Sequence, residues 1–193
     1  RGFLQADGYD VYTRIAAEEA GITLVGCWAH ARRKFHEAAK ASKKVGAAQE
    51  ALSRIKKLYQ IEKKLRATEL SPQEFLKRRK EQAEPVLESF KQWLAKKSET
   101  VVPSTLLGKA VAYTLKEWDK LIGYLVSPEL TPDNNAAENA IRPFVLGRKN
   151  WLFKGSVAAG ERAANLTGVL VGNDMPALEV VERVGDPGRD IEV

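Results

Sequence analysis

Hydrophobic residues change their spacing along the chain, and these changes separate short extended segments from longer helices. Residues 3–6 form a partly apolar run that predicts a strand ending at Asp7, where a following glycine signals a turn. Residues 8–20 carry apolar side chains at helical spacing, and Gly21 is suited to cap that helix. Residues 22–28 are apolar and β-branched, as in a buried strand. This order predicts two parallel strands with a helical crossover, and Asp7 at a carboxyl end, where ligands gather in such sheets.

The middle of the chain has the periodicity of amphipathic helices. Apolar residues recur at three- and four-residue spacing over residues 47–66. A capping box at Ser71, with Pro72 at the first helical position, begins a second helix that Pro85 can kink. We expect these two helices to form an antiparallel hairpin. A third helix, with its own apolar stripe, is predicted over residues 103–125.

A dense group of polar residues follows Pro132. Pro132 cannot continue a preceding helix or strand, and Asp133 and Asn134 are both favourable N-cap residues, so a helix is predicted to begin here. That helix carries Glu138 in its first turns and Arg142 one turn later, on the same face. Spacing alone favours a capped surface helix with one ion pair over a catalytic role.

The end of the chain is predicted to lose regular structure. Ser156 can cap a helix over residues 157–170, and glycine and proline residues break any long element after it. Acids outnumber bases beyond this point. Residues 171–193 are therefore expected to form a weakly ordered tail.

Composition places the 193-residue chain among soluble globular proteins, with 44% hydrophobic and 29% charged residues. No segment approaches the ~20 apolar residues of a membrane span, and no signal peptide is visible. The single cysteine, Cys27, excludes an internal disulfide and fits a reducing cytoplasm. We expect a cytoplasmic protein with one domain, or one domain with a large insertion.

Positive charge is concentrated in the predicted helices. The net charge of +6 suggests a polyanionic partner only if the charge is clustered. Residues 40–97 carry 16 Lys or Arg against 7 Asp or Glu, whereas acids exceed bases in the remainder. Lys77–Lys80 is a run of four cations, which is typical of a solvated helix face and also suits nucleic-acid contact.

Cys27 and His30 are spaced like half of a zinc site. Residues 27–30 are predicted to close the second strand, and residues 31–35 to open a basic helix. Zinc needs four ligands, or three and a water, and His36 is the only other histidine in the sequence. We therefore expect Cys27 to be a buried apolar residue, and His30 to be a polar group at a site rim or a structural histidine.

Three motifs together resemble the insertion-sequence-66 family of bacterial transposases. The first is residues 3–9 (FLQADGY) and the second is residues 25–35 (VGCWAHARRKF). The third combines residues 133–138 (DNNAAE) with residues 141–143 (IRP) and 147–151 (GRKNW). They follow the order expected for that family, and the resemblance covers roughly the first 166 residues.

The resemblance implies a DDE transposase with an RNase H-like catalytic core. Asp7 then matches the second catalytic carboxylate and Glu138 the third, while Cys27 and His30 match a C-x-x-H signature of architectural role. The implied fold class is helix-rich α/β, a partial RNase H-like core with a helical insertion between the last strand and the Glu-bearing helix. The implied segments are a strand-helix-strand unit at 1–36, a basic helical insertion at 37–130, the Glu-bearing helix and the end of the core at 131–170, and a divergent tail at 171–193.

The implied reaction is DNA cleavage and strand transfer by in-line displacement at phosphorus. Two Mg²⁺ or Mn²⁺ ions, held by Asp7 and Glu138 in the complete enzyme, suit this chemistry because hard cations take carboxylate oxygens. The implied partners are transposon ends and target DNA, other element-encoded proteins, and further copies of the chain assembled on DNA at the nucleoid, with no membrane. The residues expected to contact DNA are Arg32, Arg33, Lys34, Asn135, Arg142, Arg148 and Lys149. Asn134 and Asn135 can each cap the helix or contact DNA, and capping is favoured over DNA contact.

Two departures from the family pattern concern activity. A DDE site needs a first Asp on an earlier strand, which is expected to precede Arg1, so the chain is expected to be inactive alone. Residues 167–193 no longer resemble the family, as after a frameshift. These departures predict a transposase remnant, or one coding piece of an interrupted element. A non-catalytic helical protein that binds nucleic acid through its basic middle segment, or a degenerate remnant, is the alternative.

Overall fold

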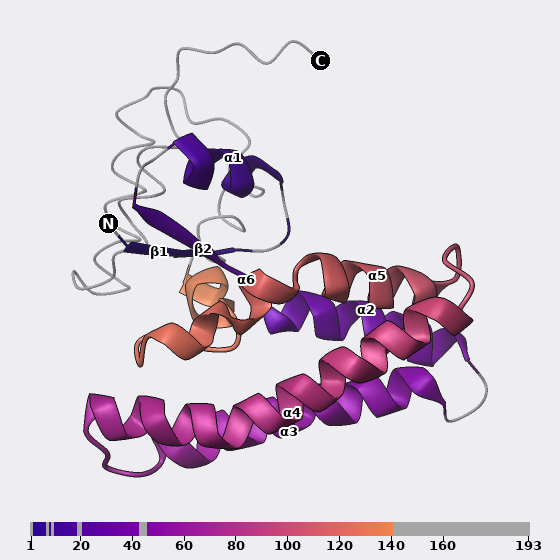
Figure 1. Ribbon diagram of the computed structural model, residues 1–193. Coiled ribbons are helices and arrows are strands. Elements are labelled where there is room, and N and C mark those ends of the chain that lie inside the picture. The colour runs from indigo at the N-terminus through magenta and orange to yellow at the C-terminus, as the bar shows by residue number, and fades with distance from the viewer. Residues whose placement is uncertain (1, 7, 9, 19–20, 43–45, 141–193) are drawn as a thin grey trace. The chain divides into compact units, whose positions relative to one another are not determined.

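The computed structural model of the chain describes residues 2–6, 8, 10–18, 21–42 and 46–140 (Figure 1). The chain divides into two compact units, Arg1–Asn134 and Asn135–Val193. In the part described, the first unit holds two strands and the helices α1 to α6, and the second begins with a helical segment at residues 135–140.

The two strands form the predicted parallel pair. Strand β1 (Gly2–Gln5) pairs in parallel with β2 (Ile22–Val25), and α1 (Asp10–Glu18) connects them and packs against β2. Gly21, just before β2, has a φ of 98°, a left-handed conformation that glycine adopts without strain. A helix-rich α/β class is thus confirmed for the described residues, whereas an RNase H-like core stays a prediction.

The junction between β2 and α2 (Trp28–Ala41) differs from the sequence prediction. The strand was predicted to continue through residue 28 and close at residues 27–30, but it ends at Val25 and the helix begins at Trp28. The physical reason is that the backbone N–H of Gly26 donates to the carbonyl of Lys120 at 2.8 Å rather than to the neighbouring strand. Cys27 consequently occupies the N-cap position of α2.

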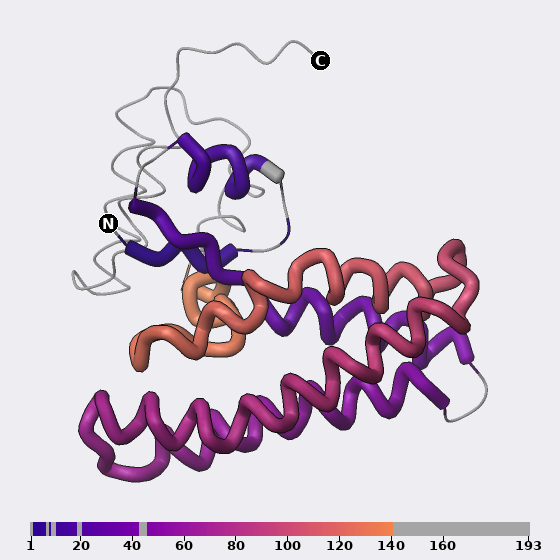
Figure 2. The backbone as a smooth tube through the Cα atoms, viewed as in Figure 1, coloured from indigo at the N-terminus to yellow at the C-terminus, as the bar shows by residue number. Residues whose placement is uncertain are grey.

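The predicted hairpin is confirmed. Helices α3 (Ala47–Arg66) and α4 (Pro72–Thr100) pack against each other, and Figure 2 shows them side by side along their length. The hydroxyl of Ser71 accepts a hydrogen bond of 3.3 Å from the backbone N–H of Glu74, so the predicted N-terminal cap of α4 is present. Pro85 lies inside α4, which continues through it to Thr100.

The third predicted helix is divided into three pieces. Helix α5 (Leu106–Lys116) begins later than predicted, after Thr105, whose hydroxyl caps it by accepting from the N–H of Gly108 at 3.0 Å. A break at Glu117 separates α5 from α6 (Trp118–Ile122), and the 3₁₀ turn η1 (Gly123–Val126) follows. The carbonyl oxygens of Lys120 and Leu121 accept from Gly26 and Trp28, so tertiary contacts replace the continuous helix.

Aromatic side chains from several helices form the centre of the core. Trp28 stacks on Phe90 with ring centroids 6.0 Å apart and meets Trp118 edge-on at 5.9 Å, while Phe35 packs against Phe90 at 6.3 Å. All four side chains are buried, so they serve as core rather than as platforms for stacked bases.

No helix in the described part of the chain has the length and apolar character needed to cross a membrane.

Candidate functional site

The predicted site residues divide between described and undescribed parts of the chain. Glu138 is exposed on the helical segment 135–140, with Asn135 exposed at its start. Arg32 and Arg33 are exposed on α2, and the ammonium group of Lys34 lies 4.6 Å from the centre of the Tyr113 ring. Asp7, Arg142, Arg148 and Lys149, which complete the predicted catalytic and DNA-binding residues, lie outside the described residues.

A hydrogen bond links the end of β1 to the segment that leads to Glu138. Gln5 is the last residue of β1 and comes two positions before Asp7. Its side-chain amide donates to the carbonyl of Thr131 at 2.7 Å and to that of Gly26 at 3.3 Å. The first motif therefore contacts the segment just before the third, although 126 residues of sequence separate the two bonded residues.

The second motif contacts the same segment. The backbone N–H of Trp28 donates to the carbonyl of Pro132 at 2.9 Å, and the indole N–H donates to the carbonyl of Leu121, also at 2.9 Å. Trp28 is fully buried. The start of α2 thereby fixes the backbone at Pro132, six residues before Glu138.

Cys27 lies in this junction as a buried, neutral thiol. Burial raises the pKa of Cys27, and the nearby carboxylate of Asp133 raises it further, while the backbone N–H groups of Asn134, His30 and Ala29 oppose the shift. Burial is the largest of these effects. In the described part of the chain, no group of three or more His, Cys, Asp or Glu side chains is arranged to hold a metal ion.

One of the two predicted N-cap side chains, that of Asn134, does not form the capping hydrogen bond. Asn134 precedes the helical segment, but its side-chain oxygen is buried and accepts no hydrogen bond from the described residues, so the predicted capping role is wrong for this side chain. Burial first, and then the neighbouring Asp133 carboxylate, raise the pKa of Tyr59. The Tyr59 hydroxyl is therefore neutral at physiological pH. It lies near the Asp133 carboxylate, but the two groups do not meet the strict geometry of a hydrogen bond.

A buried arginine was missed by the sequence prediction of a solvated cationic run. Arg79, inside Lys77–Lys80, is 0% exposed, and its guanidinium group donates to Glu62 at 2.8 Å. The same group donates to the carbonyls of Tyr124 at 2.7 Å and Ser127 at 2.8 Å. Burial lowers the pKa of Arg79. The Glu62 carboxylate opposes that shift, because its negative charge favours the charged guanidinium.

Arg66 completes this cluster around the loop that follows η1. It pairs with Glu62 at 2.7 Å and donates to the carbonyls of Pro128 at 3.0 Å and Leu130 at 2.9 Å. Arg79 also reaches the Leu130 carbonyl, at 3.0 Å. Two arginines of the hairpin thus hold the backbone that leads into Thr131. A sequence signal existed, because Glu62 interrupts the apolar stripe of α3.

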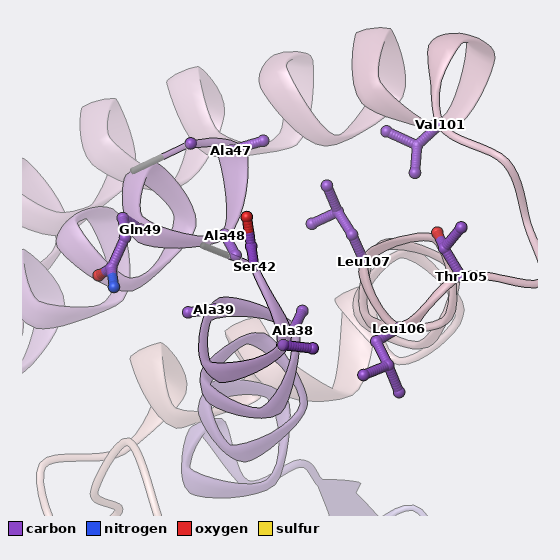
Figure 3. A pocket seen from close by; sticks show the side chains of 12 residues that line it. Ala38, Ala39, Ser42, Ala47, Ala48, Gln49, Val101, Thr105, Leu106 and Leu107 are labelled. Atoms are coloured by element: carbon purple, nitrogen blue, oxygen red, sulfur yellow. The ribbon is translucent and has the colours of Figure 1, made fainter. Parts of the chain in front are cut away.

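A pocket of about 590 Å³ lies elsewhere, where α2, α3 and α5 meet (Figure 3). Its lining side chains are small or apolar with a few neutral polar groups, as Ala38, Ala48 and Leu107 illustrate. Among the residues that the structure describes, no acid or base lines it.

Sequence comparison connects the chain with known proteins. Three proteins of Sinorhizobium fredii (strain NBRC 101917 / NGR234) are similar to it. Uncharacterized protein y4hP is 34% identical over 183 residues, while Uncharacterized protein y4jD and Uncharacterized protein y4qI are 32% and 33% identical over 174 and 175 residues. Each alignment covers 88% of this chain and 32–34% of the relative, so the chain spans about a third of the length of these curated relatives. No solved structure matches the chain.

A family profile gives the more specific result. The profile described as Transposase IS66 family matches residues 1–162, a range that contains all three motifs. The contacts of Gln5 and Trp28 with residues 131 and 132 bring the first two motifs to the segment just before the third. The chain belongs to the IS66 family of transposases.

Proposed function

We propose that this chain carries two of the carboxylates with which a DDE transposase cuts DNA and transfers its strands. Asp7 and Glu138 are the proposed catalytic acids, and the RNase H-like core is the proposed framework. The contact between Gln5 and the Thr131 carbonyl carries the proposal, because it joins the strand that precedes Asp7 to the segment that precedes Glu138. Family membership supports the reaction class.

The donor chemistry fits a divalent cation. Asp7 and Glu138 supply carboxylate oxygens, which hard cations such as Mg²⁺ or Mn²⁺ prefer, and Glu138 is exposed. The described residues do not contain a complete ligand set. When bound, a pair of such ions activates the attacking oxygen and stabilises the leaving oxygen of a phosphodiester.

The proposed DNA contacts surround these acids in the sequence. Arg142, Arg148 and Lys149 follow Glu138, and Arg32 and Arg33 are exposed on α2. Guanidinium groups suit phosphate because they donate paired hydrogen bonds. Asn135 and Lys34 are proposed as further DNA contacts, through a neutral amide group and a positively charged ammonium group respectively. The same proposal includes transposon ends and target DNA as substrates, assembly of several copies on DNA, and other element-encoded partners at the nucleoid.

Strand transfer by a complete IS66-family transposase carrying this chain's segment tests the proposal. Asp7→Asn and Glu138→Gln are each expected to lower the transfer rate by at least about 100-fold, since losing even an outer partner of a metal site costs 10–100-fold. Asp119→Asn is the matched control, because Asp119 is an exposed acid on α6. Transfer that survives both substitutions, or falls equally in the control, would contradict the catalytic assignment.

A non-catalytic nucleic-acid-binding protein is the second candidate. The concentration of Lys and Arg in residues 40–97 favours it. DNA binding that weakens with salt, without Mg²⁺-dependent cleavage in the complete protein, would support this candidate over the first.

A further inference from the structure

Lysine side chains occupy the outward face of α3. The buried face of this helix is formed by Ala48, Ala51, Ile55, Leu58, Glu62 and Leu65. The exposed residues opposite are Ser53, Lys56, Lys57, Gln60, Lys63 and Lys64. At 3.6 residues per turn these six positions fall within about one third of the helix circumference. Since Glu62 is buried, α3 presents four cations and no exposed acid between Ser53 and Arg66.

These lysines differ from the arginines of the same hairpin. Arg54, Arg66 and Arg78 each pair with a glutamate one turn earlier, at 2.8, 2.7 and 2.6 Å respectively. Within the ranges that the structure describes, the four α3 lysines make no salt bridge, hydrogen bond or cation–π contact. Their charge is therefore not neutralised by neighbouring side chains.

The outward face of α4 has a different charge pattern. The exposed lysines of α4 are Lys77, Lys80, Lys91 and Lys96, and the exposed acids Glu81, Glu84, Glu88 and Glu99 lie among them. Opposite charges this close together offset each other, so their combined field is weak beyond the distance that separates them. Four exposed lysines on α4 are thus matched by four exposed acids, whereas α3 carries four exposed lysines and no exposed acid between Ser53 and Arg66.

The composition of the α3 face favours one class of partner. Protein interfaces have aromatic or apolar centres and are depleted in lysine, and a membrane-binding helix needs a free apolar face. The apolar face of α3 packs on α2 and α4, and Ser53 and Gln60 are the neutral residues of the outward face. Backbone phosphates need only cations and small polar donors. Lys56 and Lys63 lie about 10.5 Å apart along the axis, close to three base-pair steps of duplex DNA.

We infer that the outward face of α3, defined by Lys56, Lys57, Lys63 and Lys64, binds the sugar-phosphate backbone of duplex DNA. This inference rests on the proposed function for its choice of polyanion. It assigns the contact to a helix far in sequence from both catalytic acids. Lysine acts there as a point charge without base recognition, so the surface holds DNA without reading its sequence.

Anisotropy of a short fluorescent DNA duplex, titrated with the full 193-residue chain between about 50 and 200 mM salt, tests the inference. The test variant replaces Lys56, Lys57, Lys63 and Lys64 with glutamine. The matched control replaces the exposed lysines Lys80, Lys96, Lys109 and Lys116 with glutamine, so both variants lose the same charge. Circular dichroism verifies that both keep the helical content of the parent chain.

The α3 variant is expected to bind the duplex at least about tenfold more weakly than the control variant. Its plot of log affinity against log salt should also be shallower by about 0.9 for each DNA phosphate that the variant no longer neutralises. Equal affinities and equal slopes for the two variants would overturn the inference. So would displacement of the duplex from the parent chain by polyglutamate at equal charge concentration, because the surface would then lack preference for a nucleic acid.

The two proposals can fail separately. The four α3 substitutions leave both proposed catalytic acids in place, so DNA binding and strand transfer can be measured as separate properties. Absent strand transfer with a binding loss specific to the α3 variant would reject the proposed function and retain this surface. If strand transfer depended on Glu138 and the four α3 substitutions did not affect DNA binding, the proposed function would be retained and the α3 surface rejected.

Discussion

Arg79→Ala is expected to lower the free energy of unfolding by about 3–5 kcal/mol, the cost of breaking a buried ion pair by removing one partner. The Glu62 carboxylate would keep Arg66 as a partner but would lose the guanidinium that neutralises it in the interior. The carbonyls of Tyr124 and Ser127 would also lose their donor. Urea unfolding of the chain, followed by circular dichroism, measures this change.

The neighbouring Arg78 provides a matched control. Its guanidinium group pairs with Glu74 at 2.6 Å, but both side chains are substantially exposed, at 46% and 39%. Exposed pairs one helical turn apart contribute little to stability, so Arg78→Ala should lower the free energy of unfolding far less than Arg79→Ala. An Arg79→Ala variant as stable as Arg78→Ala would contradict the structural role of the buried cluster.

Trp28→Ala is expected to destabilise the fold by about 3–5 kcal/mol, as for other buried aromatic residues truncated to alanine. The indole stacks on Phe90, meets Trp118 edge-on, and donates to the Leu121 carbonyl. Its loss would leave a large cavity at the start of α2 and an unsatisfied buried carbonyl. The same urea titration measures the effect.

Trp28→Phe separates packing from hydrogen bonding. Phenylalanine retains an aromatic ring but cannot donate to the Leu121 carbonyl, so a smaller loss of about 1–3 kcal/mol is expected. If Trp28→Phe and Trp28→Ala destabilised the chain equally, the aromatic contacts would contribute nothing measurable. That result would contradict the role assigned to the Trp28 ring at the centre of the core.

Local sequence patterns predicted the elements that depend on local interactions. The bounds of α3, at residues 47–66, follow from apolar periodicity over five turns, and the start of α4 follows from the Ser71 cap and the proline after it. The parallel pairing of β1 and β2 follows from the strand-helix-strand order. In each case the determining residues lie close together in the sequence.

Long-range contacts account for the errors. The end of β2 depends on a hydrogen bond between the Gly26 N–H and the Lys120 carbonyl. Where α5 and α6 are divided, the carbonyls of α6 accept hydrogen bonds from Gly26 and Trp28, which lie at the junction of β2 and α2. The burial of Arg79 depends on Glu62 and on carbonyls 45 and 48 residues later. Periodicity within one helix cannot reveal these partners.

The candidate site was predicted by motif rather than by spacing. Between Asp7 and Glu138 lie the helices α1 to α6, so no local pattern connects the two acids. The structure adds the contacts of Gln5 with Thr131 and of Trp28 with Pro132, which the motifs alone did not predict. Tyr59 and Asn134, close to the same junction, were not recognised as neighbours of Cys27 and Asp133.

The metal preference of cysteine variants tests the central claim most directly. Asp7→Cys and Glu138→Cys, each in a complete IS66-family transposase carrying this segment, replace a hard oxygen ligand with a softer sulfur. If both residues bind the catalytic cation, strand transfer by each variant should be lost with Mg²⁺ and recovered with Mn²⁺, while the parent enzyme uses both. Strand transfer by the variants that is as fast with Mg²⁺ as with Mn²⁺, and as fast as in the parent enzyme, would contradict metal binding by Asp7 and Glu138.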